Sequence, residues 1–198
     1  MSTRKMPTGE EPPKGYESLV AKPKIEGVEV KGVFVTQLAK NERFEIESVR
    51  AKALSSIRSP TGLTNEVLTF EDEINIIPDK STSDKMLFLA RCDSTLAGYA
   101  LVIIGWPQPA TWTIQHMIIN PGNRLRGIGT TIVQQVENYA LSSAVASENI
   151  FAIPIEREGT GFWKFLGYTV ETGRLPVRIG GLNRELMICR KELSALEP

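Results

Sequence analysis

A glycine-rich turn between a strand-like and a helix-like segment is the part of this sequence best suited to chemistry. Gly127 and Gly129 follow Arg124 and Arg126, and a helical pattern begins at once. The first N–H groups of a helix lack intrahelical partners, and the helix dipole adds partial positive charge at the same end. Glycines let an oxygen-rich group approach this backbone, and arginines add charge-assisted contacts. The turn therefore predicts a site for an anion such as a pyrophosphate.

The turn lacks the residues that two other phosphate-binding loops require. A Walker A loop needs a lysine that is missing here, and the GxGxxG pattern of a dinucleotide-binding loop does not occur. A nucleotide triphosphatase and a Rossmann dinucleotide site are therefore disfavoured. The remaining alternative is a glycine-rich turn with solvated arginines and no ligand.

Strands and helices are predicted on both sides of this turn. Period-two runs and short apolar runs predict strands over residues 28–38, 85–92, 96–106, 111–120, 150–155, 168–171 and 185–190. Apolar residues at the helical period predict helices over residues 41–57, with Asn41 as N-cap, and over 129–145 and 160–167. The last two strands are separated by a long connection that contains Gly180 and Gly181. This order predicts an α/β fold dominated by one sheet.

Two further segments have little apolar surface that could be buried in a core. Residues 1–26 contain four prolines among glycine, glutamate and lysine, which predicts a disordered tail before a single domain over 27–198. Residues 58–84 hold six carboxylates and two basic residues, a net charge of −4. We expect a mobile acidic segment there, with room for one short helix.

Composition excludes several classes of protein. The chain has 198 residues, 41% hydrophobic and 23% charged, as expected of one domain with a core. Its 23 basic residues balance 23 acidic ones, so we expect neither nucleic-acid nor anionic-membrane binding. The first residues lack the apolar region of a secretory signal, and the longest apolar run is too short to span a bilayer. Cys92 and Cys189 lie far apart, which suggests free thiols in the cytoplasm.

Two blocks of the sequence resemble the GNAT superfamily of N-acetyltransferases. A strand that ends in Ile-Asn-Pro at 119–121, then RLRGIG at 124–129 and a helix, is similar to the acetyl-CoA signature of that family. The run FWKFLGY at 162–168 looks like its second block, FYxxxGF. The resemblance in element order covers about residues 27–193. It implies a GNAT-like fold, a mixed, mostly antiparallel V-splayed sheet flanked by helices, whose fourth and fifth strands separate.

The resemblance also implies a ligand and an activity. Acetyl-CoA would lie between the splayed strands, and no metal is expected, since one histidine and two distant cysteines cannot build a zinc site. The cofactor-binding residues it implies are Met117, Ile118, Ile119, Arg124, Leu125, Arg126, Gly127, Ile128, Gly129, Thr130 and Trp163. The implied activity is transfer of an acetyl or other short acyl group from acyl-CoA to a primary amine of a small molecule, amino acid or peptide.

The general acid of the family is replaced in this sequence. The tyrosine that usually protonates the leaving thiolate falls on Trp163, whose indole N–H cannot release a proton near neutral pH. Tyr168 or Tyr99 could substitute for it. The alternative for each tyrosine is a ring packed on the sheet.

The general base is also not marked clearly. The usual positions on the fourth strand fall on Thr113 and Gln115, and neither is a base. His116, the only histidine, would face the other side of a regular strand, although a β-bulge could turn it inward. Glu156 and Glu158, after the fifth strand, are the other candidates, with solvated loop charges as the alternative.

Other functions and the choice of acceptor stay open. The missing tyrosine and carboxylate suggest a non-catalytic acyl-CoA-binding module, and a longer acyl chain from CoA or a carrier protein is a second alternative. Residues 173–184 contain three arginines and no carboxylate. If this loop and the acidic segment 58–84 border the acceptor, an amine that also carries an anionic group would fit. The oligomeric state, a homodimer included, stays open as well.

Overall fold

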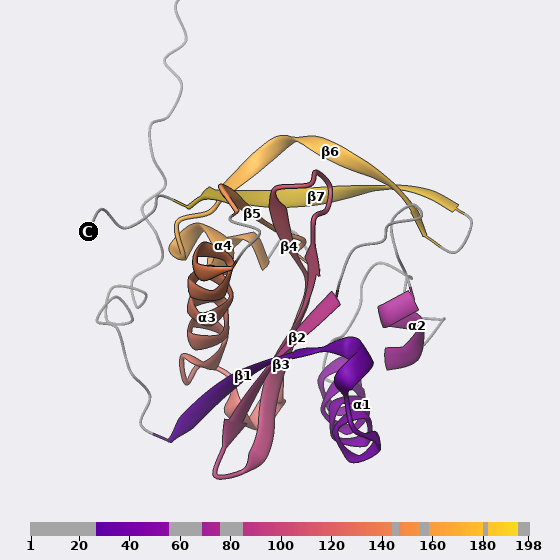
Figure 1. Ribbon diagram of the computed structural model, residues 1–198, viewed down its shortest axis with the longest axis vertical. Coiled ribbons are helices and arrows are strands. Elements are labelled where there is room, and N and C mark those ends of the chain that lie inside the picture. The colour runs from indigo at the N-terminus through magenta and orange to yellow at the C-terminus, as the bar shows by residue number, and fades with distance from the viewer. Residues whose placement is uncertain are drawn as a thin grey trace, which may run out of the picture.

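The computed structural model describes residues 27–55, 69–75, 85–143, 147–154, 159–179 and 182–193. They form a seven-stranded sheet in the order β1-β2-β3-β4-β5-β7-β6, with helices on both faces (Figure 1). Neighbouring strands are antiparallel except β4 and β5, which run parallel. This arrangement confirms the predicted α/β class and the mixed, mostly antiparallel sheet.

Most of the predicted elements are present. The strands are β1 (Val28–Phe34), β2 (Lys85–Cys92), β3 (Thr95–Ile104), β4 (Thr111–Ile119), β5 (Asn149–Ala152), β6 (Thr169–Ile179) and β7 (Leu182–Glu192). The helices are α1 (Lys40–Ser55), α2 (Phe70–Asn75), α3 (Ile128–Ser142) and α4 (Thr160–Phe165), with 3-10 turns η2 (Val35–Gln37) and η4 (Pro121–Asn123). The antiparallel meander β2-β3-β4 and the helix after the glycine-rich turn are confirmed.

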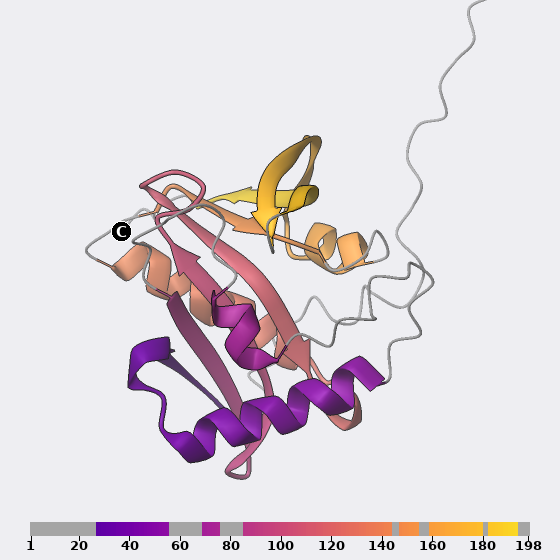
Figure 2. The same cartoon turned by 90° about the vertical axis from the view of Figure 1, so that its right-hand side faces the viewer.

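Two apolar cores hold the helices to the sheet. On one face, Ile132, Val133 and Val136 of α3 pack with residues such as Phe88 of β2. On the other face, α1 and α2 cover Leu87, Tyr99 and Leu101 of β2 and β3. Figure 2 shows α1 and α2 in front of the sheet and α3 behind it. In the described part of the chain, no helix has the length and apolar character needed to cross a bilayer.

The start of α1 differs from the prediction. The backbone N–H of Ala39 donates to Glu42 Oε2 at 3.1 Å, a side-chain contact typical of a helix start. Asn41 lies inside the first turn, so its assignment as N-cap was wrong. Phe44 was counted with the apolar face but is 77% exposed. The residues that α1 buries against the sheet include Ile46, Val49 and Ala53.

The C-terminal strands are much longer than predicted. β6 and β7 have 11 residues each and form a hairpin that pairs from Thr169 and Arg190 to Ile179 and Leu182. The long connection expected between them, residues 173–184, was therefore wrong, because nearly all of it lies within the two strands. β6 is an edge strand with β7 as its partner, so it tolerates Gly173 and Pro176, which obscure the strand pattern.

Several expectations concern segments outside the described residues. These include the tail 1–26, residue Ile57 of the first predicted helix, and most of the acidic segment 58–84. Within that segment, α2 is the short helix that was expected.

The sheet opens between β4 and β5. The two strands pair over only four residues, Thr111–Ile114 with Asn149–Ala152. One more hydrogen bond, from Ile153 N to Ile114 O at 3.0 Å, ends this pairing. β4 continues for five residues to Ile119, and among the described residues none pairs with that edge of β4. We call this gap the split, and it confirms the predicted splay.

Candidate functional site

A cavity of about 380 Å³ lies where the split meets the start of α3. Nine of the eleven predicted cofactor-binding residues line it: Met117, Ile118, Ile119, Arg124, Leu125, Gly127, Ile128, Gly129 and Thr130. The other two, Arg126 and Trp163, are described residues outside this lining. The sequence did not point to five further lining residues: Ala53 and Leu54 of α1, Asn123, and Phe162 and Phe165 of α4. Both phenylalanines stand in the second motif, whereas the residues of α1 carry no local signal.

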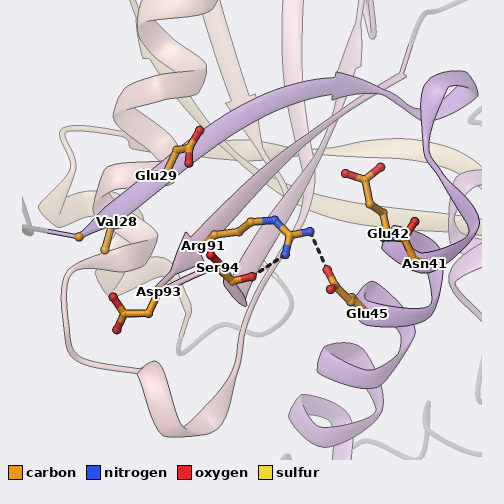
Figure 3. A pocket seen from close by; sticks show the side chains of 9 residues that line it. Val28, Glu29, Asn41, Glu42, Glu45, Arg91, Asp93 and Ser94 are labelled. Atoms are coloured by element: carbon orange, nitrogen blue, oxygen red, sulfur yellow. Dashed lines mark hydrogen bonds and ion pairs between the residues drawn. The ribbon is translucent and has the colours of Figure 1, made fainter.

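A larger cavity of about 650 Å³ lies between the start of β1, the start of α1 and the β2–β3 hairpin (Figure 3). Figure 3 shows Arg91 extended toward Glu45 of α1, and the two side chains form an ion pair of 2.6 Å. The carboxylates that line this cavity are Glu29, Glu42, Glu45 and Asp93. Like charges repel, so this cavity is unsuited to a phosphate. The cavity at the split is therefore the candidate site.

The turn before α3 provides backbone donors for an anion. The first backbone hydrogen bond of α3 runs from Thr131 N to Gly127 O at 3.0 Å. The N–H groups of residues 128–130 therefore precede the repeating bonds of the helix. Gly127 caps the helix with φ 76°, a left-handed conformation that glycine adopts without strain. Backbone donors beside the Arg124 guanidinium suit an anionic oxygen group.

Two glycines allow close packing in this region. A Cβ atom on Gly129 would lie 3.3 Å from Phe162 Cζ and 3.4 Å from Met117 Cε, two side chains of the cavity. A Cβ atom on Gly98 of β3 would lie only 2.8 Å from Ile118 O of β4. Side chains larger than hydrogen at these positions would therefore fill the cavity or displace β4. In the sequence Gly98 only interrupts an apolar run, because the strand it approaches, β4, is far along the chain.

A β-bulge in β4 changes the direction of the side chains beyond it. His116 pairs with Leu101 and Ile114 pairs with Val102, so Gln115 is the extra residue. Residues paired in an antiparallel sheet point to the same face, and Leu101 belongs to the α1 core. The bulge therefore turns His116 to the α1 face, whereas regular alternation would have kept it with Ile114 on the α3 face.

His116 lies among buried polar side chains. Its Nε2 atom is 3.1 Å from Gln115 Nε2, and Gln115 is only 6% exposed. Burial, followed by the positive charges of Arg50 and Lys85, lowers the pKa of His116 to about 4. Burial also lowers the pKa of Lys85 to about 8, and its ammonium donates to Ile74 O of α2. At neutral pH the imidazole is therefore uncharged and lies beside two cations.

Comparison with known proteins identifies the family of this chain. A family model described as the acetyltransferase (GNAT) family matches residues 52–168, which is more than half of the chain and includes both motifs. The chain belongs to the GNAT acetyltransferase family. Its members are acyltransferases that take the acyl group from CoA. No curated protein sequence gives a significant match.

Solved GNAT structures share the fold of this chain. An acetyltransferase from Thermus thermophilus has a TM-score of 0.57 at 16% identity, over 84% of this chain and 97% of that one. A GNAT acetyltransferase from Elizabethkingia anophelis with acetyl-CoA bound has a TM-score of 0.54 at 12% identity, over 85% and 99%. The ribosomal-protein-S18-alanine N-acetyltransferase from Escherichia coli has a TM-score of 0.55 at 10% identity, over 85% and 97%. At these identities the likeness concerns the fold alone.

Two aromatic residues of the second GNAT motif lie in the α3 core of this protein. Trp163 is 5% exposed and makes edge contacts with Phe162 and Tyr168. The Tyr168 hydroxyl donates to Glu137 Oε1 at 3.1 Å, and Lys191 holds the same carboxylate at 2.9 Å. Burial and then the Glu137 carboxylate raise the pKa of Tyr168, so its proton is held firmly. These contacts favour packing roles for both residues.

Glu156 and Glu158, the two glutamates predicted as alternative general bases, lie outside the described residues. Within the described ranges, no group of three or more His, Cys, Asp or Glu side chains could hold a metal ion.

Proposed function

We propose that this GNAT protein transfers an acetyl or other short acyl group from acyl-CoA to the primary amine of a small molecule, amino acid or peptide. The observation that carries the proposal is the continuity of the cavity with the split. The same cavity joins an anion-binding turn to strand backbone that has no partner strand beyond Ile114 among the described residues. Acyl-CoA fits both features. Its pyrophosphate is anionic and suits the turn, and its pantetheine arm carries amide groups that can bond to the strand backbone.

The residues of the cavity fit such a ligand. Backbone N–H groups of residues 125–130 and the Arg124 side chain would hold the pyrophosphate. The backbone of Met117 and Ile119 would bond to the amides of the pantetheine arm, in place of the missing strand. Gly129 keeps the cavity open at the point where a Cβ atom would contact Phe162 and Met117. When bound, acyl-CoA supplies an activated thioester.

The polar residues on the α1 face favour an acceptor that is a neutral amine. An amine attacks only when its nitrogen lone pair is free. Burial and the charges of Arg50 and Lys85, which lower the pKa of His116, act in the same direction on an ammonium bound beside it. His116 stays uncharged at neutral pH, and its low pKa makes it a weak base. We therefore assign the activation of the amine mainly to its environment.

Thiol release tests this function. The protein is incubated with acetyl-CoA and a panel of amines, amino acids, peptides and aminoglycosides, and free CoA thiol is followed with time. Release that depends on the amine, together with an acylated product identified by mass spectrometry, is the expected result. Binding of acetyl-CoA without turnover across the panel would instead favour a non-catalytic binding module. Turnover with longer acyl-CoA or acyl carrier protein alone would favour the long-chain alternative.

The two cysteines support a cytoplasmic location. Cys92 and Cys189 are both free thiols, and Cys189 is fully buried. Free thiols are typical of proteins from reducing compartments. Fluorescence microscopy or fractionation of the tagged protein would test this location.

A further inference from the structure

We propose that Gln115 selects primary over secondary amines by accepting a hydrogen bond from the N–H group that a primary amine keeps after acyl transfer. This inference rests on the acyl transfer proposed above. It adds the side chain that distinguishes a primary from a secondary amine nitrogen in the acceptor.

Gln115 occupies a singular position in the sheet. It is the extra residue of the bulge in β4, next to Ile114, where the pairing of β4 with β5 ends. The cavity follows β4 from Ile119 to Met117, two residues short of Gln115. The four strand steps from Ile119 to Gln115 correspond to about 13 Å along the strand. A pantetheine arm that follows this backbone from the pyrophosphate site therefore brings its thioester end near Gln115.

The nitrogen and the oxygen of the Gln115 side-chain amide differ in their hydrogen bonding. Its Nε2 atom is 3.1 Å from His116 Nε2, and an amide nitrogen can only donate, so this imidazole nitrogen accepts. The proton of the neutral imidazole then lies on Nδ1. Among the described residues, no donor contacts Gln115 Oε1, although this atom is buried. His116 thus fixes the amide, and its oxygen is left as a buried acceptor.

A buried amide oxygen without a donor destabilises the protein, whereas a donor supplied by a ligand removes that penalty. The bulge places the Gln115 amide beside His116, where the pairing of β4 with β5 has ended. The environment there favours a neutral amine, as argued above. An amine N–H is therefore the donor that fits Oε1 best.

The chemistry of amide formation explains why the number of N–H bonds matters. The amine nitrogen forms a C–N bond to the acyl carbon as the thioester C–S bond breaks. One N–H proton is lost and ends on the released thiol, so atoms and charge balance. A primary amine keeps its second N–H, which can stay bonded to Gln115 throughout. A secondary amine has only the N–H that it must lose, so its product has none left for this oxygen.

The test compares matched pairs of acceptors. Wild-type protein, Gln115→Met and Gln115→Glu are assayed with acetyl-CoA and either glycinamide or sarcosinamide, and either phenethylamine or N-methylphenethylamine. In wild type we expect kcat/KM to be higher for the primary amine of each pair. In Gln115→Met, which keeps the side-chain size but has no oxygen, the ratio of primary to secondary kcat/KM falls about tenfold or more. Gln115→Glu keeps an acceptor oxygen and retains the ratio.

The outcomes separate this inference from the proposed function. An unchanged ratio in a folded, active Gln115→Met protein would overturn the role of Gln115 and leave acyl transfer intact. No thiol release with any amine in the wild type would overturn the acyl transfer and this inference with it. Calorimetric CoA affinity and thermal unfolding of each variant show whether its fold and its ligand site are preserved.

A second measurement tests the orientation of the amide. The protein contains one histidine, so its imidazole nitrogen resonances can be assigned without ambiguity. We expect long-range 1H–15N spectra to place the proton on Nδ1 in the wild type. A proton on Nε2 would mean that the amide is turned the other way and presents its NH2 group to the acceptor, which would overturn the proposal.

Discussion

Gly129→Ala should weaken CoA binding without unfolding the protein. Gly129 lies in the first turn of α3, where alanine is favoured over glycine by up to about 1 kcal/mol. The new Cβ atom would lie 3.3 Å from Phe162 Cζ and 3.4 Å from Met117 Cε, so these side chains must move by a few tenths of an ångström. The gain and the cost offset each other. We expect the free energy of unfolding to change by less than about 1 kcal/mol.

The effect on binding is expected to be larger, because the methyl group would lie in the cavity at the turn where we place the pyrophosphate. Displacement of the pyrophosphate from one backbone N–H removes a hydrogen bond to a charged group, worth about 1.5 to 3 kcal/mol. The Kd for CoA should therefore rise about 10- to 100-fold. Isothermal titration calorimetry measures the Kd, and urea denaturation measures the stability of the same preparation.

Two other glycines serve as controls for this experiment. Gly122, in the preceding 3-10 turn η4, has only Asn120 Oδ1 at 4.0 Å from a new Cβ atom, so Gly122→Ala should leave both CoA affinity and stability unchanged. Gly127 has φ 76°, so Gly127→Ala should weaken binding and also lower stability by about 1 to 2 kcal/mol. Unchanged CoA affinity in folded Gly129→Ala protein would refute the placement of the pyrophosphate at this turn.

Three further predictions concern the core and its charges. Trp163→Phe should keep most of kcat and lower the free energy of unfolding by about 1 to 2 kcal/mol, because this residue packs in the α3 core. A loss of several orders of magnitude in kcat with unaltered CoA affinity would instead show a catalytic role for Trp163. Glu137→Gln should lower the urea midpoint, because it breaks the half-buried ion pair between Glu137 and Lys191. The control Glu192→Gln changes a carboxylate that is 80% exposed and should have little effect, so equal effects of the two variants would contradict a stabilising role of the Glu137–Lys191 pair. The pKa of His116 is lowered from 6.5 to about 4 in the folded protein, so the unfolded chain binds more protons in that pH window and stability should fall as pH drops from about 6.5 to 4. His116→Gln should show a shallower fall in urea titrations over that range, and an identical slope would contradict the burial of a neutral imidazole.

Local patterns in the sequence were sufficient for much of the fold and for the glycine-rich turn that lines the candidate site. The β2-β3-β4 meander could be predicted because each strand is apolar and its turns are short. The turn at residues 124–129 could be recognised because glycine spacing and the start of a helix lie within one continuous segment. Nine predicted ligand residues line one cavity for the same reason.

Some signals along the chain were misleading because edge and core positions depend on neighbours. Residues 173–184 contain glycine, proline and arginine, yet 173–179 and 182–184 lie in strands β6 and β7, since an edge strand needs few apolar residues. Trp163 stands where the motif suggests ligand contact, but the packing of α4 places it in the core and leaves Phe162 and Phe165 at the cavity. The Tyr168 hydroxyl meets Glu137, which is 31 residues away in sequence.

The sequence by itself determined the nucleus of the site, namely a strand, a glycine-rich turn and a helix that can hold an anion. Only the tertiary structure decided which side chains meet at the far end of β4. The direction of His116 depends on a bulge, and a bulge exists only in the register between β4 and β3. The low pKa of His116 depends on Arg50 of α1 and Lys85 of β2, whose distances from it are set by packing across the sheet. Hydropathy and spacing describe neighbours along one chain segment, whereas strand register and electrostatic fields depend on segments far apart in sequence.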